Sequence, residues 1–129
     1  MLFRSYLDYS AFRLAPRSEE FEEFVRFVIK SWRDTGGEPD IGVDLPGWLE
    51  EEGFEIQSLR PIINVVSPSN HIWEWPAAFV QVGLGRLVDL KLLPQARAGA
   101  ILADFRRRES SPNTRMITPV VLEMIARKK

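Results

Sequence analysis

The feature that most constrains the fold is the alternation of extended and helical segments along the chain. Residues 2–14 open with aromatic and bulky side chains, which suit a strand followed by a loop. Residues 54–59 are predicted to form a second strand, which Pro61 disturbs, and residues 62–66 continue the extended chain. Residues 114–126 are apolar with little alternation, as in a strand that is covered on both faces. Two helical segments lie in each gap, so the chain is predicted to be an α/β layer fold with parallel crossovers.

Capping signals divide the first gap into two helices. Ser18 is predicted to cap a helix that ends at Gly36-Gly37, because glycine reaches the left-handed conformation at little cost. Asp44 is predicted to cap a short helix over residues 45–52, with Trp48 and Leu49 facing inward and Gly53 just past its end.

Proline positions divide the second gap in the same way. Residues 67–70 are predicted to be a loop, and Pro76 suits the first turn of a helix that runs to Lys91. Pro94 is predicted to open the next helix, residues 95–108.

Composition narrows the class of protein. The chain has 129 residues, 45% of them hydrophobic and 27% charged, which fits one globular domain over residues 1–129. The formal net charge of −1 gives no indication of a nucleic-acid partner. The absence of cysteine excludes disulfides and thiolate metal sites. No apolar run reaches membrane-spanning length and no signal peptide is recognised, so we expect a cytoplasmic protein without a membrane partner.

Three stretches of sequence resemble one enzyme family. Residues 36–62, GGEPDIGVDLPGWLEEEGFEIQSLRPI, are similar to the helix-to-strand passage before the sixth strand of class I S-adenosylmethionine-dependent methyltransferases. SYLDYSAFRL resembles the end of the fifth strand and its loop. ITPVVLEMIARKK resembles the seventh strand, which in that family closes the sheet antiparallel between strands five and six.

This resemblance implies a fold and a function. The fold would be the C-terminal part of a Rossmann-like methyltransferase sheet, with about three strands and the last one antiparallel. A helical, lid-like insertion would occupy about residues 67–111. The function implied is methyl transfer from S-adenosylmethionine to a small-molecule acceptor, with this chain forming the acceptor-side half.

The cofactor site of the family has no counterpart in the sequence. In the family a glycine-rich turn after the first strand holds the cofactor, and a carboxylate after the second strand binds its ribose. The nearest glycine pattern, Gly83-Leu84-Gly85, lies in a helical segment and does not follow a strand. Four of the usual seven strands have no counterpart either. We therefore expect that the chain alone does not bind the cofactor, and we assign no cofactor-binding residue.

Tyr6, Asp8 and Tyr9 are candidate acceptor-binding residues. They follow the first strand, and ligands bind at the ends of strands in open α/β sheets. The resemblance also implies that this loop lies near the transferred methyl group. The alternative is an exposed loop at a sheet edge.

The loop SPSNHIWEWP supplies the other candidates. Trp73 and Trp75, two apart in an extended segment, would share one face and could wall an acceptor pocket. The alternative is core packing. His71, the only histidine, is a weak candidate for the catalytic base, and a surface or capping role is the alternative.

Asp40 and Asp44 are four residues apart and could bind a metal ion or act as an acid–base pair. No histidine or further carboxylate accompanies them. We therefore interpret Asp40 as a turn residue and Asp44 as a helix cap, and we predict no metal site.

Two other functions remain open. The chain could be a non-catalytic module that dimerises, or binds a partner chain, through the free edge of its first strand. This association would bury Leu2, Phe3, Tyr6 and Leu7. It could also be an unrelated small-ligand-binding domain with an internal pocket formed by Trp73, Trp75 and Phe79. Strand pairing distinguishes these readings, because the methyltransferase reading requires the last strand to lie antiparallel between the other two.

Overall fold

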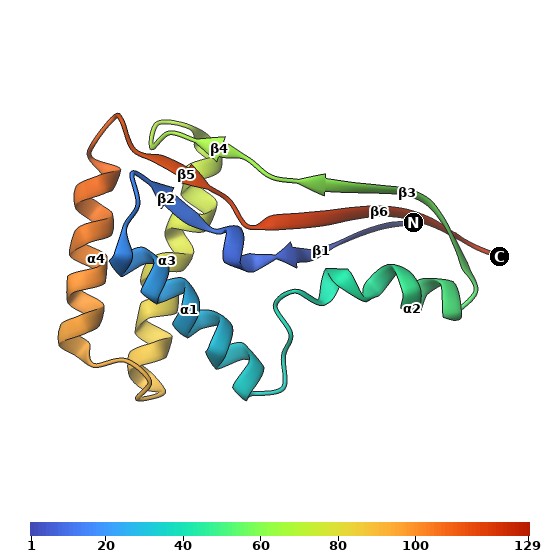
Figure 1. The fold of residues 1–129 in the computed structure, drawn as a ribbon, viewed down its shortest axis with the longest axis horizontal. Coiled ribbons are helices and arrows are strands. Elements are labelled where there is room, and N and C mark those ends of the chain that lie inside the picture. Colours follow the sequence, from blue (N-terminus) through green and yellow to red (C-terminus); the bar gives the residue numbers. More distant parts are fainter.

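The protein has a helical body and a narrower arm (Figure 1). The computed structural model describes all of residues 1–129. The body contains helices α1, α3 and α4, and the arm contains α2 beside three long strands. The helices are α1 (Glu19–Asp34), α2 (Leu45–Glu51), α3 (His71–Asp89) and α4 (Gln95–Glu109), with short 3-10 turns η1 (Tyr9–Ala11) and η2 (Ile41–Val43). The strands are β1 (Leu2–Asp8), β2 (Arg13–Ala15), β3 (Phe54–Ile62), β4 (Val65–Val66), β5 (Arg115–Ile117) and β6 (Val120–Lys128).

The same three stretches of chain build two consecutive sheets. The arm sheet has the order β1-β6-β3, and the body sheet has the order β2-β5-β4. Every pairing is antiparallel, with Leu2 opposite Ile125 and Leu14 opposite Met116. The C-terminal stretch is therefore the middle strand of both sheets.

The strand pairing corrects two expectations. Parallel neighbours do not occur, because β6 separates β1 from β3 and runs antiparallel to both. The three expected strands are also each divided in two. The interruptions are η1, residues 63–64 and residues 118–119, and they occur at one level of the sheet. Asn64 and Thr118 bridge this level, since the backbone N–H of each donates to an oxygen of the other at 2.9 Å.

The principal core lies between the body helices and the body sheet. It joins aromatic side chains of α1 and α4, including Phe21, Phe24 and Phe105, to Leu14 and Met116 of the sheet. The segment expected to be an insertion, residues 67–111, is helical as predicted. Its inward faces belong to this core, through residues such as Trp73, Val80, Leu87 and Ile101.

A smaller core supports the arm. Leu49 of α2 packs against Leu122, Met124 and Ala126 of β6, and Phe3 and Phe54 flank this cluster. Trp48, predicted to face inward, is instead 47% exposed on the outer side of α2. Asp44 precedes the helix as expected, but its side chain makes no capping hydrogen bond.

Two further boundaries differ from expectation because of proline. Helix α3 begins at His71, five residues before Pro76, which lies inside the helix. Asn70 caps it, because its Oδ1 accepts from the N–H of Ile72 at 2.9 Å. Strand β3 continues through Pro61 to Ile62. Proline is tolerated there because β3 is an edge strand.

A buried polar contact joins α1 to α4. Ser18 caps α1 as predicted, with Oγ accepting from the N–H of Phe21 at 3.0 Å, and its hydroxyl donates to Asp104 at 2.6 Å. Arg107 and Arg108 also donate to Asp104, which is 4% exposed. Burial raises the pKa of Asp104, but the hydrogen bonds from Ser18 and Arg108 outweigh it, so the pKa lies below its ordinary value.

This contact predicts an acid-sensitive contribution to stability. Because folding lowers the pKa of Asp104, its contribution is complete above the unfolded pKa of about 3.9 and is lost as pH falls through the folded value. We expect Asp104→Asn to lower the free energy of unfolding by about 1–2 kcal/mol at pH 7. Urea denaturation at several pH values should show this difference shrinking below about pH 4. Asp89→Asn, at an exposed carboxylate without an ion pair, is the matched control. A difference in unfolding free energy between Asp104→Asn and the parent protein that does not change with pH would contradict a stabilising role of the ionised carboxylate.

Candidate functional site

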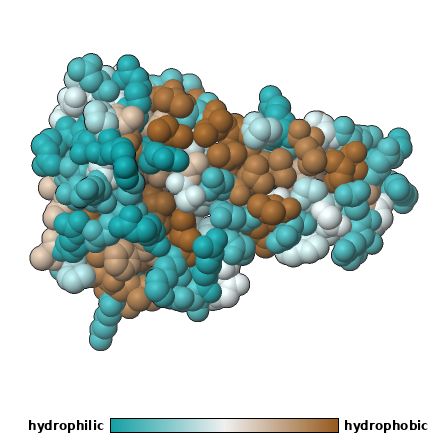
Figure 2. Space-filling view, in the orientation of Figure 1, coloured by the Kyte–Doolittle hydropathy of each residue, from teal (hydrophilic) through white to brown (hydrophobic).

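A crevice lies at the junction of body and arm, where the strands are interrupted. Three adjoining hollows share the side chain of Tyr6, with volumes of about 540, 160 and 260 Å³. The 540 and 160 Å³ hollows also share Trp75, and the 160 and 260 Å³ hollows share Trp32. In the view of Figure 2, apolar side chains gather around the junction and along the arm.

The 160 Å³ hollow, which we call the aromatic cavity, is walled by six aromatic side chains. These are Tyr6, Tyr9, Phe12, Trp32, Trp75 and Phe79. Tyr9 lies edge-on to both Tyr6 and Trp32, with ring centroids 5.0 and 4.9 Å apart. Such perpendicular pairs are a favoured aromatic geometry, so the walls are mutually supported. Pro76 and Pro119 complete the lining.

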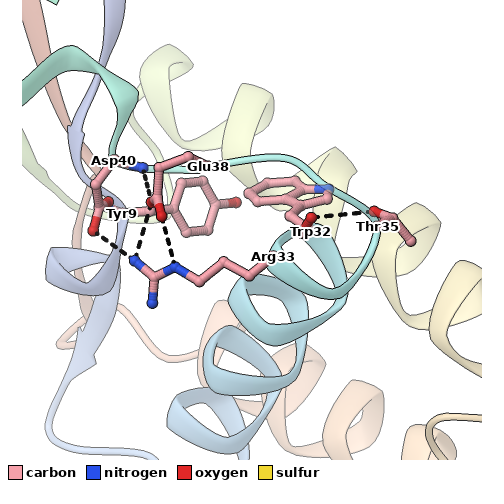
Figure 3. A network of polar contacts seen from close by, with 6 residues as sticks. All are labelled: Tyr9, Trp32, Arg33, Thr35, Glu38 and Asp40. Atoms are coloured by element: carbon pink, nitrogen blue, oxygen red, sulfur yellow. Dashed lines mark hydrogen bonds and ion pairs between the residues drawn. The ribbon is translucent and has the colours of Figure 1, made fainter. Parts of the chain in front are cut away.

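A polar network at the C-terminal end of α1 fixes the backbone of Tyr9 (Figure 3). The backbone N–H of Tyr9 donates to Asp40 Oδ1 at 2.8 Å. Arg33, at the end of α1, donates to both carboxylate oxygens of Glu38 and, at 3.3 Å, to Asp40. The hydrogen bonds from Arg33 lower the pKa of Glu38, so this group stays ionised and the link persists at neutral pH. The network joins η1 to the C-terminal end of α1.

The phenol groups of the cavity are protonated at neutral pH. Burial raises the pKa of Tyr9, and the proximity of Tyr6 raises it further. Burial also raises the pKa of Tyr6. Neither hydroxyl donates or accepts a hydrogen bond within the protein. Both are therefore available as hydrogen-bond donors, and neither is suited to act as a base.

The face of the arm sheet away from α2 leads into the crevice. Three rows of side chains cross it, as the register of the strands dictates: Leu2, Ile125 and Ser58; Arg4, Glu123 and Arg60; Tyr6, Val121 and Ile62. In the middle row Glu123 accepts from Arg4 at 2.8 Å and from Arg60 at 2.9 Å. Arg4 lines the 540 Å³ hollow together with Tyr6, Ile62 and Trp75. Two guanidinium groups thus face one carboxylate beside the crevice.

The structure brings three of the predicted acceptor-binding residues together. Tyr6, Tyr9 and Trp75 come from β1, η1 and α3, and all three line the aromatic cavity. Asp8 lies at the same strand end but is exposed, and its carboxylate accepts from Ser10 at 2.6 Å.

The structure separates the remaining candidates from the cavity. Trp73 and Trp75 do not share a face, because they lie on a helix, where two residues turn through about 200°. Trp73 is 2% exposed, stacks on Phe105, and donates from Nε1 to Glu109 at 2.7 Å. His71 is the exposed first residue of α3, its side chain makes no hydrogen bond with the protein, and it does not line the cavity.

Sequence reasoning missed several cavity residues. Trp32 was not expected to line a site, and Phe79 was expected there only in the alternative of an internal pocket with Trp73 and Trp75. The place of both at the crevice depends on how α1 and α3 cross. No local sequence pattern indicated a binding role for Arg4, because Glu123 and Arg60, which lie beside it in the sheet, are remote in sequence. Asp40 is a structural residue, as interpreted, and no group of three or more potential ligands is arranged to hold a metal ion.

The turn η2 fixes the outer side of the crevice by approaching β1 closely. A Cβ atom added at Gly42 would lie 2.5 Å from the backbone oxygen of Tyr6. We expect Gly42→Ala to displace η2 from β1 and to lower the free energy of unfolding by about 1–3 kcal/mol. Gly47→Ala is the matched control, since no atom lies within 4 Å of a Cβ there and alanine favours a helix by up to about 1 kcal/mol. Thermal denaturation of both variants checks this, and an unchanged Gly42→Ala protein would contradict the close approach.

Comparison with known proteins identifies no family for the chain. No protein-family model matches the sequence, and no curated protein matches it significantly. None of the helices has the combination of length and apolar character that crossing a membrane requires. Functional assignment therefore depends on the crevice and the sheet that supports it.

Proposed function

We propose that residues 1–129 form the acceptor-side half of an S-adenosylmethionine-dependent methyltransferase that acts on a small molecule. The observation that carries the proposal is the order of the arm sheet, in which β6 lies between β1 and β3 and runs antiparallel to both. The resemblance of residues 36–62 and of the C-terminal segment implies this arrangement for the last strand of a Rossmann-like methyltransferase sheet.

The aromatic cavity supports an acceptor-binding role. It lies where β1 ends, which is the end of a strand at which the resemblance implies that the acceptor binds. Its walls are apolar and aromatic with a few polar groups, as in small-molecule sites generally. Tyr6, Tyr9 and Trp75 would bind and orient the acceptor.

The residues described here do not fit the methyl donor. Gly83 and Gly85 lie inside α3, and a Cβ atom at Gly83 would come within 3.0 Å of the Phe24 ring. Gly83 thus allows close packing between α1 and α3, and no glycine-rich turn follows a strand. A donor site would belong to polypeptide outside residues 1–129, and this proposal assigns the chain binding and orientation of the acceptor only.

Titration with S-adenosylmethionine, with the mass in solution measured on the same sample, tests this division of roles. We expect no saturable binding at micromolar concentration by calorimetry. Saturable binding would contradict the proposal, because it would require a donor site built from residues 1–129 or across a dimer of them.

A second candidate function is non-catalytic association through the free edge of β1. Met1 exchanges backbone hydrogen bonds with Ala126 in both directions. By the alternation of an antiparallel ladder, the backbone groups of Leu2 and Arg4 then point away from β6. Leu2 is also 56% exposed. Unpaired edges of this kind favour pairing with another strand.

The edge hypothesis predicts a charge-sensitive dimer. We expect Leu2→Lys to convert a dimer into a monomer, because lysine opposes strand pairing at an edge. Leu90→Lys, at an exposed leucine beyond the end of α3, should leave the mass unchanged. Light scattering after gel filtration measures both. A monomeric parent protein, or equal effects of the two variants, would contradict self-association through β1.

A further inference from the structure

We propose that the aromatic cavity binds a single-ring aromatic carboxylate, with the hydroxyls of Tyr6 and Tyr9 donating to the carboxylate. This inference names the chemical class of the acceptor, and in that sense it rests on the proposed function. The binding itself requires no methyl donor.

The size and lining of the cavity select one aromatic ring. Its volume is about 160 Å³, and an apolar cavity of about 150 Å³ is sufficient to bind benzene. No charged side chain lines it. Trp32, Trp75 and Phe79 offer ring faces and edges, against which a flat aromatic ligand packs better than a branched aliphatic one. Trp75 is 59% exposed, so the cavity has an open side through which a ligand can enter.

Two unused hydroxyls select an oxygen acceptor. Tyr9 is only 3% exposed, and its hydroxyl makes no hydrogen bond with the protein. Because no fully buried side-chain polar atom lacks a partner, this hydroxyl oxygen is accessible and free to bond a ligand. Tyr6 is close to it, with ring centroids 5.0 Å apart, and its hydroxyl is likewise unpaired. Both groups are protonated, so each can donate to the ligand. The polar network fixes the backbone of Tyr9, and edge-on contacts with Tyr6 and Trp32 orient its ring before a ligand arrives.

The charge on the arm-sheet side of the cavity favours an anion, whereas the carboxylate of Glu38 lines the hollow on the side of α1. The neighbouring hollow shares Tyr6 and Trp75 with the cavity and is also lined by Arg4. Arg4 and Arg60 together carry one more positive charge than Glu123 neutralises. Hydrogen bonds to a charged acceptor are also stronger than those to a neutral one. A carboxylate therefore fits this end of the site better than a neutral group.

Benzoate, benzamide and toluene are the probes for this proposal, because they share the ring and differ in the acceptor group and charge. We expect saturable binding of benzoate by ligand-observed NMR or calorimetry, with toluene bound about tenfold more weakly or less. Benzamide should lie between them, because it has an oxygen acceptor without the charge. Toluene binding as tightly as benzoate, or no binding of benzoate, would overturn the proposal.

Variants of the two tyrosines locate the binding. Tyr9→Phe should weaken benzoate binding by about tenfold and change toluene binding less than about twofold. Tyr6→Phe is the second variant, because Tyr6 is only partly buried and its replacement disturbs the core less if Tyr9→Phe proves unstable. Arg13→Gln, at an exposed arginine on β2 that does not line the cavity, is the control against Arg4→Gln, which should weaken benzoate alone. Benzoate affinity that neither tyrosine variant changes would overturn the assignment.

Failure of this inference is distinguishable from failure of the proposed function. If benzoate does not bind, the ligand class is wrong and methyl transfer to another acceptor remains tenable. If benzoate binds at the tyrosines but the chain also binds S-adenosylmethionine saturably, the division into acceptor and donor halves is wrong while the ligand class stands.

Discussion

The structure depends on the C-terminal stretch, which supplies the central strand, paired on both sides, of each of the two sheets. β6 pairs with β1 and β3, and β5 pairs with β2 and β4. Met116 and Met124, in the middle of the two sheets, are completely buried. Neither sheet can form before the C-terminal stretch is in place, because Leu14 must meet Met116 and Leu2 must meet Ile125. The fold is thus dominated by contacts between residues that are remote in sequence, which is a property of slowly folding topologies.

The crevice is a result of how this central strand is interrupted. The short segment Thr118-Pro119 separates β5 from β6, and η1 and residues 63–64 interrupt the neighbouring strands at the same level. At this level the arm sheet leaves the helical body (Figure 1). Side chains of β1 and α3 line the aromatic cavity there, at the margin of the principal core. Tyr9 connects the arm to the helical body. Its backbone is bonded to Asp40, and its ring contacts Trp32 of α1 and Tyr6 of β1.

Local signals in the sequence predicted much of the secondary structure. The Ser18 cap, the stop at Gly36 with φ of 91°, and the turn at Gly53 with φ of 87° are each determined by a few neighbouring residues. The predicted start of α3 at Pro76 was wrong, because Asn70 caps the helix earlier in the sequence. This error placed Trp73 and Trp75 on one face and so misjudged which tryptophan belongs to the core.

The candidate site was only partly predictable for a different physical reason. Tyr6, Tyr9 and Trp75 were identified because a strand end and an aromatic-rich loop are visible locally. Trp32, Phe79 and the Arg4–Glu123–Arg60 row join the site through helix crossing and strand register, which no short window of sequence encodes. The tryptophans also differ sharply in their surroundings. Trp73 is enclosed and hydrogen-bonded to Glu109, whereas Trp75 stands largely in solvent at the mouth of the cavity. Because indole emission depends on solvent contact, covering the mouth should shift the emission of Trp75, while Trp48, exposed on α2, contributes a constant background.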